Sequence, residues 1–246
     1  MGTWKKFLPN ATIVVLDYKN LGEFIDVREL YLHLFPGRFS LMNIADAVRV
    51  AVLAKYGGIW LDLDTIILSS DVEKYFLPDE KHRMIFFGDL EDRSCHIAFM
   101  NAPPASTCMK LWYEFNREKM WNLNEETVIK SDFFGNSFIN DYSKNYVDEI
   151  KILDRKSVMP ELSLTSGLDW ESRFNAYINY YFLQNLHLAD IPCKMLLLHN
   201  SWTPKVFSQL SVEDFLYMDC TMVNVLAEAL EIKLPLAKNR FKFTVK

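Results

Sequence analysis

The chain has 246 residues, of which 50% are hydrophobic and 24% charged, with a formal net charge of −5 and an isoelectric point near 5.6. This composition is typical of an ordinary globular protein and excludes disorder over any long stretch. The negative charge excludes broad electrostatic attachment to nucleic acid, so no nucleic-acid partner is expected. A chain of this length is expected to form a single domain over residues 1–246.

Neither a signal peptide nor an apolar run long enough to span a membrane is visible in the sequence, which predicts a cytoplasmic protein. The four cysteines lack the close spacing of zinc-binding pairs. They are expected to be isolated, buried thiols of a protein that functions in a reducing compartment.

The first part of the chain is predicted to alternate between strands and helices. Segment 12–16 (TIVVL) is β-branched and apolar, which predicts a buried strand of a parallel sheet. Two helices are predicted next, over 22–35 and 41–56. The second is apolar on nearly every side, so it is expected to be buried, and Gly57-Gly58 is expected to end it. A strand over 59–68 (IWLDLDTIIL) is predicted to follow.

The remainder of the chain continues this alternation. Short apolar runs predict further strands, and longer mixed stretches predict further helices. The predicted strands are 84–87, 97–100, 150–153 and 195–198, and the predicted helices are 105–120, 125–142, 171–186 and 212–231. Strands that alternate with helices indicate an α/β fold with a mainly parallel sheet flanked by helices.

Two aspartates, Asp62 and Asp64, are the most informative residues of the sequence. Residues two apart in a strand point to the same side, so both carboxylates are expected on one face, near the carboxyl end of the predicted 59–68 strand. Two carboxylates this close repel each other unless a cation is bound between them. Oxygen ligands suit Mg²⁺ or Mn²⁺. The same ion can neutralise a diphosphate leaving group. Solvated carboxylates without a metal are the alternative.

A second polar pair, Asp46 and Arg49, lies on the buried 41–56 helix with i,i+3 spacing, so the two side chains share one face. Buried charge is costly without a partner. Either the pair forms a salt bridge to itself or to the sheet, or it binds sugar hydroxyls and a donor phosphate. The helix leads directly into the segment that contains Asp62 and Asp64, so all four side chains are expected to converge.

Segments 39–49 (FSLMNIADAVR) and 53–64 (LAKYGGIWLDLD) resemble the signature of the DXD-containing sugar transferases, which include the capsular polysaccharide synthesis glycosyltransferases and related mannosyltransferase-like proteins. The family pattern is an (A/S)D-x-x-R helix, a Y-G-G turn and a D-x-D strand, and all three parts match in order and spacing. The resemblance implies a Rossmann-type GT-A fold, a UDP- or GDP-sugar donor, a divalent metal and retention of anomeric configuration. The acceptor would be a glycan or a lipid-linked glycan of a surface polysaccharide.

The resemblance also implies roles for individual residues of these segments. Asp62 and Asp64 would be the catalytic pair. By analogy Asp46 and Arg49 hold the donor sugar, Asp62 contacts the ribose or the sugar, and Asp64 ligates the metal. Asn101, in the family's central strand, is expected to face the donor sugar, with a turn-forming role before proline as the alternative.

The segment His199-Asn200-Ser201-Trp202 gives a second resemblance near the other end of the chain. Similar transferases return a late loop to the site, where a histidine ligates the metal and a Ser-Trp element contacts the phosphates. This implies a metal-ligand role for His199 and donor-binding roles for Ser201 and Trp202, chemistry that imidazole, hydroxyl and indole groups can supply. A packed histidine and tryptophan at the edge of the core are the alternative.

The beginning of the chain departs from the family pattern. Segment 1–9 (MGTWKKFLP) resembles the helix that in the family follows a first apolar strand, so that strand is expected to be missing. A truncated, non-catalytic sugar-nucleotide-binding or scaffold protein is therefore the alternative function. A haloacid-dehalogenase-like phosphatase also uses D-x-D, but Ile66 occupies the position where that motif has Thr or Val.

The last residues, 238–246 (KNRFKFTVK), form a basic and aromatic tail on an acidic chain. A solvated terminus or an edge strand is the first interpretation. The alternative is a peripheral contact with the anionic inner face of a membrane, which would suit a lipid-linked acceptor.

Overall fold

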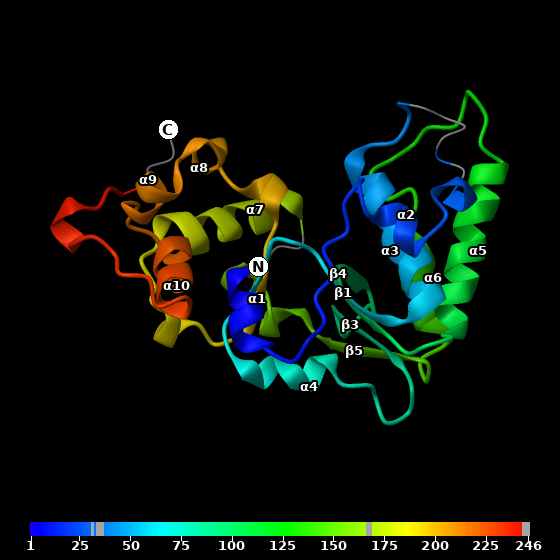
Figure 1. The fold of residues 1–246 in the computed structure, drawn as a ribbon, viewed down its shortest axis with the longest axis horizontal. Helices are drawn as coiled ribbons and strands as arrows, with labels where there is room; N and C mark the ends of the chain where they lie inside the picture. The colour runs from blue at the N-terminus through cyan, green and yellow to red at the C-terminus, as the bar shows by residue number, and fades with distance from the viewer. Residues whose placement is uncertain (31, 33–36, 166–168, 243–246) are drawn as a thin grey trace. The chain divides into compact units, whose positions relative to one another are not determined.

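The computed structural model describes residues 1–30, 32, 37–165 and 169–242 (Figure 1). The chain forms two compact units, each assembled from separate stretches of sequence. Unit 1 comprises Met1–Ala11, Asp62–Glu73 and Lys156–Lys246, and unit 2 comprises Thr12–Leu61 and Lys74–Arg155. The single domain expected over residues 1–246 stays a prediction.

Unit 2 is built on a four-stranded sheet with the strand order β1-β4-β3-β5. β1 (Gly58–Leu61) and β3 (Met84–Gly88) pair antiparallel with β4 (Cys95–Ala102), whereas β3 pairs parallel with β5 (Ile150–Asp154). The sheet is therefore mostly antiparallel, and the prediction of a mainly parallel sheet is wrong. Segment 89–94, which joins β3 to β4, suits a hairpin, because parallel neighbours need a crossover of about a dozen residues or more.

Three helices pack together in unit 2: α3 (Leu41–Tyr56), α5 (Thr107–Trp121) and α6 (Asn136–Asn145) (Figure 1). The prediction of a helix over 41–56 is confirmed. Ser40 caps its start, since its Oγ accepts from Asn43 N at 3.2 Å while the Asn43 side chain returns to Ser40 N.

Segment 12–16 forms no strand, so that prediction is wrong. Val14 and Val15 are 49% and 36% exposed, and no strand of the described part of unit 2 pairs with the segment. The predicted 22–35 helix is also only partly present, as α2 (Leu21–Phe24) and the short 3-10 helix Val27–Leu30. Residues 31 and 33–35 of that prediction lie outside the described residues.

The predicted 125–142 helix begins only at Asn136. Side chains from outside the helix bind the carbonyl groups of the preceding loop. Arg38 donates to Asn124 O and Thr127 O at 2.8 and 2.7 Å, and Asn43 Nδ2 donates to the carbonyls of residues 130 and 131 at 2.9 and 3.0 Å. These hydrogen bonds give the loop carbonyl groups the partners that a helix would otherwise supply. Local helix propensity therefore does not decide the conformation here.

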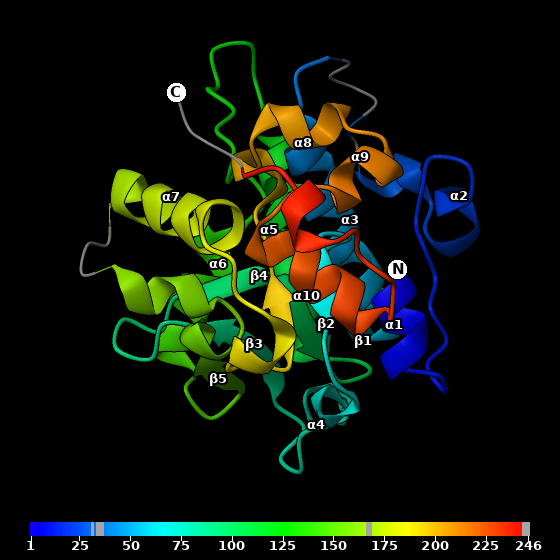
Figure 2. The same ribbon diagram turned by 90° about the vertical axis from the view of Figure 1, so that its left-hand side faces the viewer.

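Unit 1 has a two-stranded antiparallel sheet of β2 (Thr65–Ile67) and β6 (Met195–Leu197) (Figure 2). The helix expected at the beginning of the chain is α1 (Gly2–Phe7), and Trp4 Nε1 on it donates to the Thr65 carbonyl of β2 at 2.7 Å. The apolar core of unit 1 is rich in aromatic side chains from residues 177–182, which are contributed by α7 and the π-helix that follows it.

Two long helices predicted for unit 1 are each divided. α7 (Trp170–Ile178) passes into the π-helix Asn179–Leu183, and the predicted 212–231 helix consists of α9 (Val212–Leu216) and α10 (Thr221–Ala229). The second division has a tertiary cause. Phe241 N donates to Tyr217 O, and Asp219 N donates to Phe241 O, both at 2.7 Å, so the backbone between α9 and α10 pairs with the C-terminal segment.

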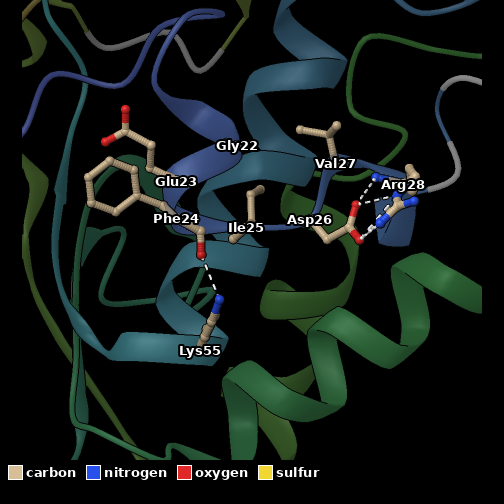
Figure 3. Close-up of a pocket in the computed structure, with 8 residues that line it drawn as sticks. All are labelled: Gly22, Glu23, Phe24, Ile25, Asp26, Val27, Arg28 and Lys55. Atoms are coloured by element: carbon tan, nitrogen blue, oxygen red, sulfur yellow. Dashed lines mark hydrogen bonds and ion pairs between the residues drawn. The ribbon is translucent and has the colours of Figure 1, made fainter.

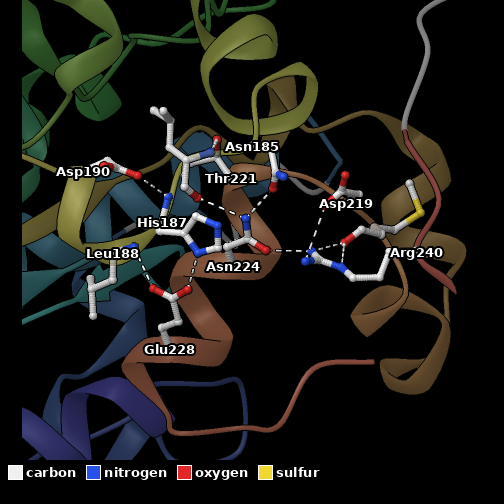
Figure 4. Close-up of polar contacts among 11 residues, drawn as sticks. Asn185, His187, Leu188, Asp190, Asp219, Thr221, Asn224, Glu228 and Arg240 are labelled. Atoms are coloured by element: carbon white, nitrogen blue, oxygen red, sulfur yellow. Dashed lines mark hydrogen bonds and ion pairs between the residues drawn. The ribbon is translucent and has the colours of Figure 1, made fainter. Parts of the chain in front are cut away.

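Arg240 holds this C-terminal segment in place (Figure 4). Its Nη2 donates to Met218 O at 2.6 Å and to Asn224 Oδ1 at 2.7 Å, and its Nη1 lies 3.4 Å from Asp219 Oδ1. The described part of the predicted tail is thus bound by the Arg240 side chain and by an isolated β-bridge between Met218 and Phe241, although the Phe241 ring is 67% exposed rather than packed. Residues 243–246 of that prediction lie outside the described residues.

All four cysteines are free and buried, as the sequence predicted. Burial raises the pKa of Cys95 and of Cys193 to about 12, so both remain neutral thiols at physiological pH. In the described stretches of the chain, no helix has the length and apolar character needed to cross a bilayer.

Candidate functional site

Asp62 and Asp64 lie in a turn between β1 and β2 rather than in a strand. The turn is closed by Thr65 N, which donates to Asp62 O at 3.0 Å. The predicted 59–68 strand is broken here because its two halves pair with different partners, β1 with β4 and β2 with β6. The alternation argument that put both carboxylates on one strand face is therefore wrong, although the turn keeps the two residues within one short, half-buried segment.

The Asp64 carboxylate contacts the late segment that the sequence singled out. Asn200 N donates to Asp64 Oδ2 at 2.9 Å, across a separation of 136 residues. The pairing of β2 with β6 explains the contact. Thr65 opposes Leu197, so in an antiparallel ladder the residues just before β2 and just after β6 reach the same end. The structure thus brings Asp64 together with the segment His199–Trp202.

His199 is packed within this segment against aromatic rings. Its ring stacks on the Trp202 indole with centroids 4.0 Å apart, and the Tyr177 ring lies edge-on at 6.0 Å. Burial, with smaller contributions from the charges of Glu161 and Asp64, raises the pKa of Tyr177 to about 12, so the phenol stays neutral. This packing agrees with the alternative of a histidine and tryptophan at the core edge, and a metal-ligand role for His199 stays a prediction.

The predicted metal site can be compared with the clusters of potential metal-ligand side chains in the structure. Among residues 1–30, 32, 37–165 and 169–242, no group of three or more His, Cys, Asp or Glu side chains is arranged to hold a metal ion. Mg²⁺, however, is usually bound through one or two carboxylates together with substrate phosphates rather than by a complete protein cage. A metal ion held by Asp62 and Asp64 together with a bound phosphate stays a prediction.

Asp46 and Arg49 form a buried ion pair in unit 2, with Arg49 Nη2 3.2 Å from Asp46 Oδ1. Arg49 Nη1 also donates to the Ile97 carbonyl of β4 at 2.6 Å, and its guanidinium carbon lies 5.3 Å from the Trp60 ring centre. These contacts correspond to the salt-bridge alternative, in which the pair binds itself and the sheet. The donor-binding roles of Asp46 and Arg49 stay predictions, as does the convergence of this pair with Asp62 and Asp64.

We expect Arg49→Lys to lower the free energy of unfolding by about 2 kcal/mol, because an ammonium group does not replace the planar fork that reaches both Asp46 and the sheet. Urea denaturation followed by circular dichroism measures the change. Arg117→Lys is the matched control, since Arg117 pairs with Glu114 at 3.1 Å on a partly exposed helix face and should change stability by less than about 0.5 kcal/mol. Equal stability of the two variants would contradict a structural role for Arg49.

Asn101 lies in β4, not in a turn. Its side-chain amide donates to Tyr75 O and to Leu77 O, each at 3.0 Å, and the residue is buried. The side chain therefore fastens the 75–77 backbone to the sheet. Its expected contact with a donor sugar stays a prediction.

Comparison with known protein families gives a match to part of the chain. The model of a family described as capsular polysaccharide synthesis protein matches residues 1–102. The chain is similar to that family there. The match contains α3, the Gly57-Gly58 turn and the Asp62–Asp64 segment, and it supports the predicted family over this part of the chain, which is less than half of the 246 residues. Comparisons with curated proteins and with solved structures found no match.

A hollow of about 300 Å³ in unit 2 has none of the predicted site residues in its lining (Figure 3). It is lined by residues 22–28 and by Lys55, whose Nζ donates to Phe24 O at 2.7 Å. Arg28 is likewise paired, 2.7 Å from Asp26. Both cations at this hollow are already bound by the chain, so it has no evident set of groups for a charged ligand.

Two features of the Asp64 region were not found by sequence reasoning. One is the backbone N–H of Asn200, which no side-chain motif identifies. The other is the pair Trp170 and Phe174, which stack on one another near Trp202. Their i,i+4 spacing on a helix was the available signal for the second feature.

Proposed function

We propose that this protein is a metal-dependent glycosyltransferase that moves a sugar from a UDP- or GDP-sugar to a glycan or lipid-linked acceptor in capsular polysaccharide synthesis. The match of residues 1–102 to capsular polysaccharide synthesis proteins supports a role in that biosynthetic process. The single observation that carries the chemistry is the bond from Asn200 N to Asp64 Oδ2, because it joins the Asp-x-Asp turn to the late His-Asn-Ser-Trp segment.

In this proposal each residue of the turn and the late segment has a defined task. Asp64, whose carboxylate is oriented by Asn200 N–H, binds Mn²⁺ or Mg²⁺, with His199 as a further ligand. Asp62 contacts the ribose or the sugar. The Ser201 hydroxyl and the Trp202 indole N–H donate to the phosphates. When bound, the divalent ion supplies positive charge that stabilises the departing nucleoside diphosphate.

A non-catalytic sugar-nucleotide-binding protein is the second candidate function. In this candidate Asp46 and Arg49 have a structural task, as an ion pair that is also bonded to Ile97 O. Such a protein would bind the donor without consuming it. The retention of configuration, the cytoplasmic location and a peripheral membrane contact through 238–246 stay predictions.

Isothermal titration calorimetry with a panel of UDP- and GDP-sugars tests the proposal. We expect at least one donor to bind in the presence of Mn²⁺, and removal of the metal with EDTA to weaken that binding by about tenfold or more, which is about 1.4 kcal/mol. Release of free UDP or GDP from the bound donor would separate the transferase from the non-catalytic candidate. If every donor fails to bind, or binds equally with and without metal, the proposal is wrong.

A further inference from the structure

Three aromatic side chains of unit 1 form a cluster that reaches the surface. Trp170 and Phe174, one helical turn apart on α7, stack with centroids 5.0 Å apart and an interplanar angle of 12°. Trp202 meets both rings edge-on, at 6.4 Å from Trp170 and 6.2 Å from Phe174. These three rings are called the aromatic platform below.

The platform has a half-buried end and an exposed end. Trp202 stacks on His199, which directly precedes the Asn200 N–H that binds Asp64. At the other end the Trp170 side chain is 62% exposed. An exposed tryptophan that stacks on a neighbouring ring, rather than packing into the core, presents a flat apolar face to solvent, a feature common in ligand-binding surfaces.

The charges around Trp170 distinguish between ligands that stack on aromatic rings. Asp169 and Glu171 flank it directly, and hydrogen bonds from Ser172 N and Oγ lower the pKa of Asp169, which is therefore ionised at neutral pH. The basic residue of the same helix is Arg173, so the carboxylates outnumber the cation. Carboxylates repel the phosphates of a nucleotide, whereas they accept hydrogen bonds from sugar hydroxyls.

We propose that the aromatic platform binds a pyranose ring of a neutral glycan chain, with the apolar C–H face of the sugar on the Trp170 indole and its hydroxyls directed to Asp169 and Glu171. A small number of polar groups around an apolar surface is the usual composition of such a site. This inference rests on the proposed function, because it identifies the chemical class of the acceptor for the site at Asp64. It assigns glycan binding to Trp170, Asp169 and Glu171, which lie outside the predicted metal and donor contacts, while Trp202 supports the platform and keeps its proposed donor contact.

Saturation-transfer NMR with four neutral trisaccharides, maltotriose, cellotriose, mannotriose and chitotriose, tests the platform on the full chain. At least one trisaccharide should bind, with the strongest transfer to the C–H protons of one ring face. Trp170→Ala should weaken its affinity by about tenfold or more, as expected for an exposed tryptophan anchor. Trp170→Phe keeps a flat ring and should retain most of the affinity.

The control is Trp121→Ala, because Trp121 is 79% exposed but lies at the end of α5 in unit 2, and it should leave trisaccharide binding unchanged. UDP and GDP titrated alone should bind equally to the parent chain and to Trp170→Ala. The inference is overturned if no trisaccharide binds, if both alanine variants bind alike, or if Trp170→Ala weakens the nucleotide instead. If the parent chain binds a trisaccharide but shows no metal-dependent donor binding, the proposed function is contradicted and the inference about the platform stands.

Discussion

Replacement of Gly57 by alanine should lower the free energy of unfolding by about 3–5 kcal/mol. Gly57 ends α3 with φ of +68° and ψ of −155°, a conformation open essentially to glycine alone. A Cβ at this position would lie 2.7 Å from Pro104 N and 2.8 Å from Pro104 Cα, and 3.0 Å from Ala102 O. These are backbone atoms at the end of β4, so the clash is relieved only if the sheet or the helix moves.

Gly58→Ala separates the two causes of the expected loss of stability, which are backbone strain at a positive φ and the clash of the added Cβ. Gly58 also has a positive φ, of +92°, but a Cβ there would meet nothing within 4 Å. Backbone strain alone should then cost about 1–3 kcal/mol. Urea denaturation of both variants, followed by circular dichroism, measures the difference. Equal losses would mean that the contact with Pro104 contributes nothing, and that the Tyr-Gly-Gly turn needs glycine only for its dihedral angles.

Replacement of Asp64 by asparagine should abolish metal-dependent donor binding while leaving the fold intact. The amide has nearly the shape of the carboxylate and keeps an oxygen that accepts the bond from Asn200 N. It lacks the negative charge that makes a carboxylate a good ligand for Mg²⁺ or Mn²⁺. We expect the affinity for the donor in Mn²⁺ to fall by about tenfold or more, or about 1.4 kcal/mol or more, to the level measured in EDTA.

Asp71→Asn is the matched control for Asp64→Asn. Asp71 is an exposed carboxylate of unit 1 that lies 3.6 Å from Lys194 Nζ, and its replacement should alter neither donor binding nor the effect of Mn²⁺. Calorimetry and thermal unfolding should be run on both variants. If Asp64 serves only to hold the late segment, Asp64→Asn would change the unfolding temperature and leave metal-dependent binding as it was, which would remove Asp64 from the proposed site.

Helix α3 was predicted from the sequence with its observed bounds, 41–56, because its signals are local. Ser40 and Asn43 form the cap within one turn, and Gly57 ends the helix. The apolar runs at 84–87 and 150–153 likewise coincide with β3 and β5. Hydrogen bonds and apolar faces of this kind involve residues a few positions apart, so the residue pattern alone specifies them.

Strand direction and the break after Leu61 were decided by tertiary structure. The sequence 59–68 reads as one continuous strand, yet its halves add to different sheets, and the free energy of each pairing depends on partners far along the chain. The loss of the 12–16 strand has the same origin. A β-branched apolar segment forms a strand only where a neighbouring strand accepts its backbone hydrogen bonds.

For the candidate site, the sequence by itself identified both segments that meet: Asp62–Asp64 through its paired carboxylates, and His199–Trp202 through its resemblance to a late loop of similar transferases. Tertiary structure alone decided how they meet, through a backbone N–H of Asn200 that any residue except proline would supply. It also decided that Arg49 binds Ile97 O, 48 residues away, instead of being held by local contacts alone. The identity of each residue determines which chemical groups are present. The hydrogen bonds that orient those groups form only when distant backbone segments pair.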